Sequence, residues 1–175
     1  FFDCEQGSLD FESVEDMARA ARLHNTASIV RVFDSKEWVI ERYLFRGVDG
    51  LVAPRIDRPE DAKRIVEGVR YCFPKEPECK LVVIQIESCS AVEEFKEFLS
   101  IDGIDVFFIG PVDLAKSMGY KGNFRLAEVQ EKIDGVIKQA RSAGRHVGIL
   151  VDDDNVEEYI KKGVRFLYTH LNAFI

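Results

Sequence analysis

The sequence lacks several features that define broad classes of protein. No uninterrupted apolar run approaches the ~20 residues that a membrane-spanning helix needs, and no basic and then apolar leader precedes Asp3. A basic cluster of the kind that binds nucleic acid is also missing, because the lysines and arginines are scattered and the formal net charge is −7. We therefore expect a cytoplasmic protein that binds neither a membrane nor nucleic acid.

Cysteines with metal-binding spacing are absent as well. The four cysteines form no CxxC pair, and none has the Cys/His spacing of a zinc site. Free thiols are the expected state, because disulfides are rare in cytosolic chains. A bridge between Cys72 and Cys79, which flank the loop FPKEP, is compatible with the spacing but not required by it.

The chain instead alternates short apolar runs with charged segments. With 175 residues, of which 46% are hydrophobic, it can bury the core of one domain, which we expect to span 1–175. The charged segments place apolar residues at helical spacing, whereas the apolar runs are short and rich in β-branched residues. The expected strands are ASIVRV (27–32), VDGLVAP (48–54), KLVVIQIE (80–87), IDVFFIG (104–110), RHVGILV (145–151) and VRFLYTH (164–170). Such alternation indicates parallel βαβ units.

The number of strands decides between two α/β folds. These six strands and FFD at the start make seven, whereas a (β/α)8 barrel has eight. An open doubly wound sheet accommodates seven strands, but the Gly-rich first turn typical of that fold is missing from DCEQGS. The chain also begins within a strand and stops soon after the last one. We therefore predict an α/β fold, a (β/α)8 TIM barrel that lacks its first β/α unit and its last helix.

Polar residues interrupt the apolar strands only near their C-terminal ends. Residues two apart share one face of a strand, so Val83, Gln85 and Glu87 should point to the same side. Arg31 lies at the end of its strand, and Asp113 follows the next Gly-Pro turn after FFI. Barrel enzymes build their active sites at this end of the strands. We therefore expect these side chains to meet there.

The residue types at these positions favour metal chemistry. Two carboxylates, Glu87 and Asp113, would repel each other unless a cation lay between them, and hard oxygen ligands suit Mg²⁺ or Mn²⁺. Arg31 can hold a substrate carboxylate with two hydrogen bonds, and backbone N–H groups around Val112 can meet an anion. A simpler interpretation remains open, because a carboxylate after a strand is often only a helix cap and Arg31 could form a surface ion pair with Asp34.

Several segments resemble one enzyme family in order and spacing. DCEQ, IVRV, GVDGLVAPRIDRPEDAKRIVEGVRY, VVIQIES, GIDVFFIGPVDLAKSMGYKG and GILV are similar to the HpcH/HpaI aldolase family, the metal-dependent class II pyruvate aldolases. The most specific pieces are the QIE strand and the GPxDLxxSMG stretch. The resemblance implies a (β/α)8 barrel that assembles into homo-oligomers. It also implies cleavage of 4-hydroxy-2-oxo acids into pyruvate and an aldehyde through a metal-stabilised enolate.

The resemblance also implies roles for individual residues. Glu87 and Asp113 match the two protein ligands of a divalent metal, which could be Mg²⁺, Mn²⁺ or Co²⁺. Arg31 matches the arginine that binds the pyruvate carboxylate, and Gln85 matches a glutamine close to the bound 2-oxo acid.

Two acidic residues match the family's D-x-E-H motif. They are Asp3 and Glu5, which the resemblance places around metal-bound water.

Two departures affect proton transfer. The family's His in D-x-E-H is Gln6 here, and the Asp that supports that His falls at Phe45. Gln cannot transfer a proton near neutral pH as imidazole can. His170, which shares a strand face with Phe166 and Tyr168, could replace the lost base, although a strand-end His facing solvent is the alternative. The sequence thus favours an aldolase, and the alternative is a relative that binds metal and a 2-oxo acid without aldol turnover or decarboxylates oxaloacetate.

Other features are expected to be structural. Trp38, Phe95 and Phe98 lie at helical spacing and are predicted to pack in the core. Ser90 and Asp57 resemble N-terminal helix signals, with Pro59 near a first turn. The acidic run VDDDN (151–155) lacks the Gly and distal Glu of a calcium loop and is expected to begin a helix.

Overall fold

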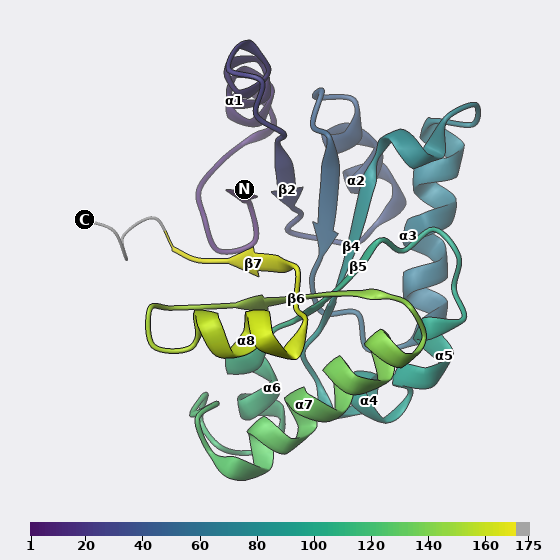
Figure 1. The fold of residues 1–175 in the computed structure, drawn as a ribbon. Helices are drawn as coiled ribbons and strands as arrows, with labels where there is room; N and C mark the ends of the chain where they lie inside the picture. Colours follow the sequence, from purple (N-terminus) through teal and green to yellow (C-terminus); the bar gives the residue numbers. More distant parts are fainter. Residues whose placement is uncertain (171–175) are drawn as a thin grey trace.

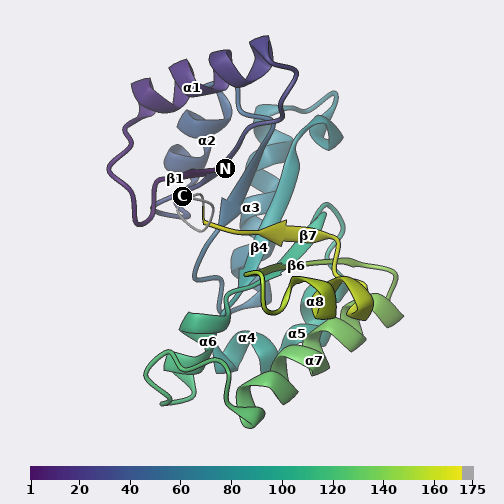
Figure 2. The ribbon, with the colours of Figure 1, turned by 60° about the vertical axis from the view of Figure 1, so that its left-hand side comes forward.

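One curled parallel sheet organises the protein, whose computed structural model describes residues 1–170. Its seven strands follow chain order, and each is hydrogen-bonded to the next. They are β1 (Phe2–Asp3), β2 (Ile29–Arg31), β3 (Gly50–Ala53), β4 (Leu81–Ile86), β5 (Val106–Ile109), β6 (His146–Leu150) and β7 (Phe166–Tyr168). The sheet curls until β7 returns toward β1, where the rings of Phe1 and Tyr168 lie 4.5 Å apart (Figures 1 and 2). Among the described residues, β1 and β7 do not pair, so this part of the chain forms a curled half-barrel and the closed eight-stranded barrel stays a prediction.

Helices cover the outer face of the sheet and connect successive strands (Figure 1). They are α1 (Phe11–Leu23), α2 (Glu37–Leu44), α3 (Pro59–Cys72), α4 (Cys89–Glu93), α5 (Phe95–Leu99), α6 (Pro111–Ser117), α7 (Ala127–Ser142) and α8 (Val156–Lys162), with one 3₁₀ turn, η1 (Pro77–Cys79). The predicted alternation of strands and helices is confirmed. No helix in residues 1–170 combines the length and apolar character needed to cross a membrane.

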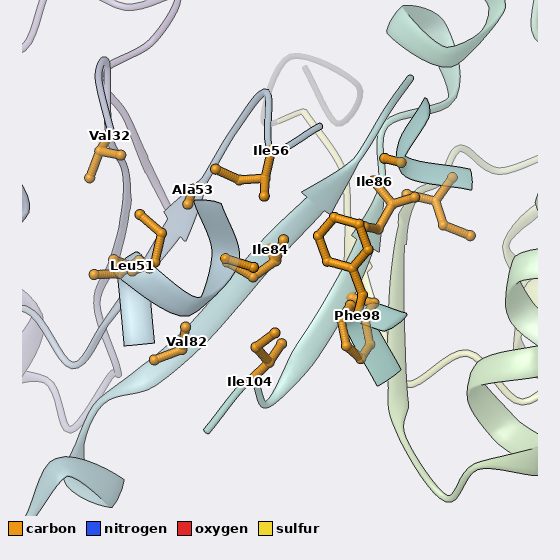
Figure 3. Packing of buried hydrophobic residues seen from close by; sticks show 14 of the residues in the cluster. Val32, Leu51, Ala53, Ile56, Val82, Ile84, Ile86, Phe98 and Ile104 are labelled. Carbon is orange, nitrogen blue, oxygen red and sulfur yellow. The ribbon is translucent and has the colours of Figure 1, made fainter. Parts of the chain in front are cut away.

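The two faces of the sheet carry different cores, as strand alternation requires. Val82, Ile84 and Ile86 of β4 pack under the helices in the main core, and Figure 3 shows them beside Phe98 and Ile104. The inner face holds a small second cluster, Val52, Val83, Val106 and Phe108, against which Ile29, Phe166 and Tyr168 pack. The predicted parity of β4 is therefore confirmed, and the inner side chains at the strand ends are left to form a site.

Short polar signals set several helix ends. Asp10 accepts a hydrogen bond from the N–H of Ser13 at 2.8 Å and caps α1, and Asp152 accepts from the N–H groups of Asp154 and Asn155 before α8. The predicted helix start at VDDDN is confirmed. Gly163 ends α8 with φ 86°, a left-handed conformation that glycine adopts without steric cost.

The predicted helix signals near residues 57–59 and 90 differ in detail. Pro59 does begin α3, but Arg58 occupies the cap position, and Asp57 instead accepts a hydrogen bond from the Ser88 hydroxyl at 2.5 Å. Ser88, rather than Ser90, caps α4 by accepting from the N–H of Ala91 at 3.2 Å. The helix then breaks at Glu94, so the segment expected as one helix forms α4 and α5.

The prediction that Trp38 packs in the core is wrong, whereas Phe95 and Phe98 are fully buried as predicted. Trp38 is 50% exposed because it lies in the first turn of α2, outside the buried face that Val39, Ile40, Tyr43 and Leu44 form. It lines an open hollow of about 710 Å³ between α2 and α3. In the described part of the chain all four cysteines are free, as expected.

Candidate active site

The end of β4 supplies the buried polar pair Gln85 and Glu87 on the inner face of the sheet. Gln85 is 2% exposed and Glu87 is 7% exposed. Both carboxylate oxygens of Glu87 accept hydrogen bonds, Oε1 from the backbone N–H of Arg55 at 2.7 Å and Oε2 from Nε2 of Gln85 at 2.9 Å. These two bonds fix the orientation of the carboxylate and leave a second lone pair on each oxygen.

Burial makes the Glu87 carboxyl an unusual acid. Desolvation, together with the nearby charges of Glu5 and Asp113, raises the pKa of Glu87 to about 7, although the N–H of Arg55 opposes the shift. Gly110 makes this position possible, because a Cβ there would lie 2.5 Å from Oε2 of Glu87. A buried carboxyl poised near neutral pH at a strand end is typical of a functional site.

Gln85 carries an unpaired polar atom into the same site. Its Oε1 is the buried side-chain oxygen that lacks a hydrogen-bond partner within residues 1–170. Buried acceptors are rarely left unpaired in folded proteins, because the lost hydration is costly. An oxygen of this kind can accept a hydrogen bond from a ligand or bind a cation.

Asp113 lies across the cavity mouth in a different environment. The Gly110-Pro111 break ends β5 and begins α6, which places Asp113 in the first turn of that helix. Its side chain is about half exposed and is paired with Nζ of Lys116 at 2.8 Å. The same helix ends with Ser117, whose hydroxyl accepts from the N–H of Cys89 at 3.0 Å and so ties α6 to the loop after Glu87.

The predicted site residues other than Asp3 and Glu5 line one cavity of about 310 Å³. Its lining is Gln6, Arg31, Arg55, Gln85, Glu87, Phe108, Gly110, Pro111, Val112, Asp113, Lys116, Leu150, Tyr168 and His170. Residues 1–170 contain no group of three His, Cys, Asp or Glu side chains that forms a complete metal cage. Two carboxylates and the unpaired oxygen of Gln85 nevertheless fit a hard ion that completes its shell with water and substrate oxygens.

Arg31 forms ion pairs with acidic residues, but not with Asp34, the partner considered from the sequence. Its Nε donates to Asp3 Oδ1 at 2.9 Å, its Nη2 contacts Asp3 Oδ2 at 2.5 Å, and its Nη1 contacts Glu5 Oε2 at 3.1 Å. Burial opposes the ionisation of Asp3, but Arg31 and two backbone N–H groups outweigh it and hold the pKa of Asp3 below its usual value. The predicted placement of Asp3 and Glu5 beside the site is therefore consistent with the geometry, and Arg31 reaches the cavity with its nitrogens already engaged.

Of the positions that the sequence linked to proton transfer, two line the cavity and one lies outside it. Gln6 and His170 both line the cavity and are exposed, and the nearest polar partner of the His170 ring is the Tyr168 hydroxyl, 3.4 Å from Nδ1. Phe45 lies outside the cavity at the end of α2, where its ring is 6.0 Å from that of Phe73. Within the described residues, His170 forms no ion pair with a carboxylate.

Arg55 is a site residue that the sequence did not reveal. It follows β3, and its backbone adopts φ 56°, which is uncommon for a residue other than glycine. Its N–H holds Glu87, and its side-chain Nε donates to Glu5 Oε1 at 2.8 Å. In the sequence, Arg55 lies in a polar loop between a strand and a helix, and no periodic pattern marks its conformation or its reach.

Known proteins similar to this chain are named as aldolases. The hydroxypyruvate/pyruvate aldolase of Roseovarius nubinhibens is 29% identical over 94% of this chain and 74% of its own length. The 4-hydroxy-2-oxovalerate aldolase of Rhodococcus jostii is 31% identical over 82% of this chain and 66% of its own length.

Solved structures have the same fold. An HpcH/HpaI aldolase/citrate lyase family protein from Burkholderia cenocepacia superimposes with a TM-score of 0.91 at 25% identity, over 99% of this chain and 79% of that one. The citrate synthase SbnG gives a TM-score of 0.90 at 22% identity, over 99% of this chain and 77% of that one, which supports the fold alone. The relatives' names are those of carbon–carbon lyases of the aldolase type. Because residues 5–171 match the family model as well, this chain belongs to the HpcH/HpaI aldolase/citrate lyase family.

Proposed function

We propose that the protein is a divalent-metal-dependent aldolase that cleaves 4-hydroxy-2-oxo acids into pyruvate and an aldehyde. The observation that carries the proposal is the Glu87 carboxylate, which is buried, oriented through both oxygens and placed in one cavity with Asp113. A folded chain keeps such a costly group where a ligand offsets its burial. The relatives named as aldolases support the same reaction class.

Glu87 and Asp113 would hold the ion, which could be Mg²⁺, Mn²⁺ or Co²⁺. When bound, the ion supplies Lewis-acid polarisation of a 2-oxo acid. Gln85 would direct its unpaired Oε1 toward the same ligand shell, because Gln85 lines the cavity together with the two carboxylates. Asp3 and Glu5 would orient water at the site through their contacts with Arg31.

The substrate carboxylate would be held inside the cavity by an arginine and a backbone N–H group. Arg31 would share its guanidinium between this carboxylate and its acidic partners, and the backbone N–H of Val112, in the first turn of α6, would donate to the same anion. Phe108 and Leu150 would exclude water from the reacting carbons.

Proton transfer would differ from that of family members with the complete dyad. Gln6 can orient a water molecule but cannot act as a base near neutral pH. His170 lines the cavity beside Tyr168 and would serve as the acid and base. A His170→Ala variant with unchanged turnover would contradict this role.

Deuterium exchange at the methyl group of pyruvate, followed by NMR, tests the proposal without knowledge of the aldehyde. We expect exchange that requires Mg²⁺, Mn²⁺ or Co²⁺ and is lost in Glu87→Gln. The variant is nearly isosteric, so circular dichroism and thermal unfolding should show an intact fold. Exchange without added metal, or full exchange in Glu87→Gln, would refute the proposed mechanism.

A second candidate function rests on the dyad positions, Gln6 and Phe45. A protein without this dyad could bind metal and pyruvate without forming an enolate, or could decarboxylate oxaloacetate, a reaction that needs no base at the same position. Pyruvate binding by calorimetry without deuterium exchange, together with release of CO₂ from oxaloacetate, would favour this alternative.

We also infer a homo-oligomer in the cytoplasm and a closed eight-stranded barrel in the whole protein. The oligomer and the barrel are inferred from the family to which the chain belongs, and the location from the composition of the sequence. Light scattering coupled to size-exclusion chromatography tests the oligomeric state, and a monomer at micromolar concentration would contradict it.

A further inference from the structure

Arg55 has a strained backbone conformation, which suggests that its side chain has a function. It is a left-handed residue, with φ 56°, between the buried residues Pro54 and Ile56, so the loop cannot relax freely around it. The left-handed turn directs the Arg55 N–H to Glu87, but a glycine would supply the same N–H without strain. Strained residues other than glycine concentrate at functional sites, so the side chain of Arg55 calls for a role of its own.

The guanidinium of Arg55 is held by one edge only. Its Nε donates to Glu5, whose other carboxylate oxygen contacts Arg31, so Glu5 bridges the two arginines. Within residues 1–170, Nη1 and Nη2 of Arg55 donate no hydrogen bond, and the side chain bonds through Nε alone. The side chain is thus positioned, while the two terminal nitrogens remain available for a bidentate contact with an anion.

Arg31 is different in this respect. All three of its guanidinium nitrogens contact Asp3 or Glu5, and its side chain is 17% exposed, whereas that of Arg55 is 74% exposed. Both arginines line the same cavity. The guanidinium with free donors is therefore the one at the cavity mouth.

The position of Arg55 at the edge of the cavity indicates which part of a substrate it would contact. Gln85 and Glu87 form a buried floor, and Arg55 and Lys116 form an exposed rim. A 2-oxo acid held at the floor through its carboxylate and keto oxygen must extend its other end toward the rim. A cation at the rim meets that distal end, which becomes the aldehyde in the proposed cleavage.

We propose that Arg55 determines specificity by binding an acidic group at the distal end of the substrate. The substrate class is a 2-oxo acid with a second anionic group, so the aldehyde released would carry a carboxylate or a phosphate. This inference rests on the proposed function and specifies its substrate.

Binding of matched ligands to the Mn²⁺-loaded protein tests the inference without turnover. The ligands are 2-oxoglutarate, which has a distal carboxylate, 2-oxo-4-phosphonobutanoate, which has a distal phosphonate, and 2-oxopentanoate, which has neither. Calorimetry should show that one of the two anionic ligands binds roughly 10- to 100-fold more tightly than 2-oxopentanoate, as expected for a charge-assisted bidentate contact. The preferred ligand distinguishes a carboxylate from a phosphate substrate.

The variant Arg55→Asn removes the guanidinium but keeps the backbone N–H, and Asn tolerates the left-handed conformation. We expect the ratio of the affinity for the ligand with the distal anion to that for 2-oxopentanoate to fall to within about threefold of one. Arg55→Gly should give the same ratio in a relaxed backbone. A merely structural role would weaken all ligands alike and leave the ratio unchanged.

Arg58→Asn is the matched control, because Arg58 is an exposed arginine of the same loop and does not line the cavity. Its ratio should equal that of the unmodified protein. The inference is overturned if the unmodified protein binds all three ligands equally. It is also overturned if Arg55→Asn keeps the full preference for a ligand with a distal anion over 2-oxopentanoate. Deuterium exchange of pyruvate by the unmodified protein is measured separately, so failure of the aldolase function and failure of the Arg55 contact give different results.

Discussion

The two carboxylates of the site lie in opposite environments. Glu87, at the end of β4, is buried and bonded through both oxygens to groups that cannot move far, a backbone N–H and an amide held within the sheet. Asp113, in the first turn of α6, is half exposed and pairs with the flexible end of Lys116. One side of the site is therefore fixed before any ligand arrives, and the other can adjust to it.

The difference separates what each residue does for folding from what it does for function. Burial of Glu87 destabilises the folded chain whenever the carboxyl is ionised, so the fold alone gives no reason to keep it. Asp113 and Lys116 form an exposed pair that contributes little to stability. If both carboxylates bind the same ion, the two should have similar effects on metal binding and very different effects on folding.

The largest expected contrast is in the pH dependence of stability. The pKa of Glu87 is raised from 4.5 to about 7 in the folded state, so its contribution is fully present below pH 4.5 and is lost as pH rises to about 7. This loss amounts to about 3 kcal/mol. Urea unfolding without metal should therefore show Glu87→Gln gaining stability over the unmodified protein as pH rises, by up to about 3 kcal/mol at pH 8.

The assignment of this pH dependence to Glu87 is checked with Glu87→Gln and with a second variant. The Glu87→Gln amide can still accept from the Arg55 N–H, and its NH₂ group can donate to Gln85 after rotation of that amide, which also satisfies the unpaired Oε1. Asp113→Asn, which removes one of the charges that raise the pKa of Glu87, should change the pH profile far less than Glu87→Gln does. Parallel profiles for the unmodified protein and Glu87→Gln would show that Glu87 is not the group responsible.

Substitution of either carboxylate should have a similar effect on metal binding. Because both carboxylates are proposed ligands, Glu87→Gln and Asp113→Asn should each weaken Mn²⁺ binding by roughly 100-fold, at or above the effect typical of outer-shell partners. Isothermal titration calorimetry at pH 8 measures both affinities. A large loss in one variant and none in the other would mean that the second carboxylate is not a ligand.

Gly110→Ala should displace Glu87, the buried carboxylate of the site. The added Cβ would lie 2.5 Å from Oε2 and 2.8 Å from Cβ of Glu87, so the carboxyl must shift. We expect a loss of about 1–3 kcal/mol in the free energy of unfolding and weaker Mn²⁺ binding. Thermal and urea unfolding measure the first effect.

Gly135→Ala is the control for that substitution. A Cβ at Gly135, inside α7, meets no atom within 4 Å, and alanine is the better helix former, so this variant should gain about 0.5–1 kcal/mol. A Gly110→Ala variant with unchanged stability and metal affinity would show that Glu87 is less tightly held than its two hydrogen bonds indicate.

The smallest effect is expected for a substitution next to Asp113, the exposed carboxylate of the site. Lys116→Met frees Asp113 from its cationic partner, so Mn²⁺ should bind about threefold more tightly at low salt, and unfolding should change by less than about 0.5 kcal/mol. Lys96→Met, which removes an exposed lysine of α5 outside the cavity, should leave affinity unchanged. Weaker binding in Lys116→Met would indicate that Lys116 positions Asp113 rather than competing for it.

Much of this contrast was predictable from particular residues. Strand parity placed Gln85 and Glu87 on the inner face, and the Gly-Pro break placed Asp113 at a helix start. The same reasoning failed at Trp38, because helical spacing does not tell where α2 begins or which turn faces the sheet. It also missed the break at Glu94, since the apolar spacing continues across it.

The order of strands and helices, the inner and outer faces of the strands and the carboxylates at the strand ends can be read from the amino-acid sequence, because they follow from periodicities of a few residues. Which groups meet depends on how the chain folds in three dimensions. The fold commits Arg31 to Asp3 and Glu5, directs the N–H of Arg55 onto Glu87 from 32 residues away in the chain, and pairs Asp113 with Lys116. Burial, hydrogen bonding and pKa depend on these distant neighbours, and a local pattern contains no information about them.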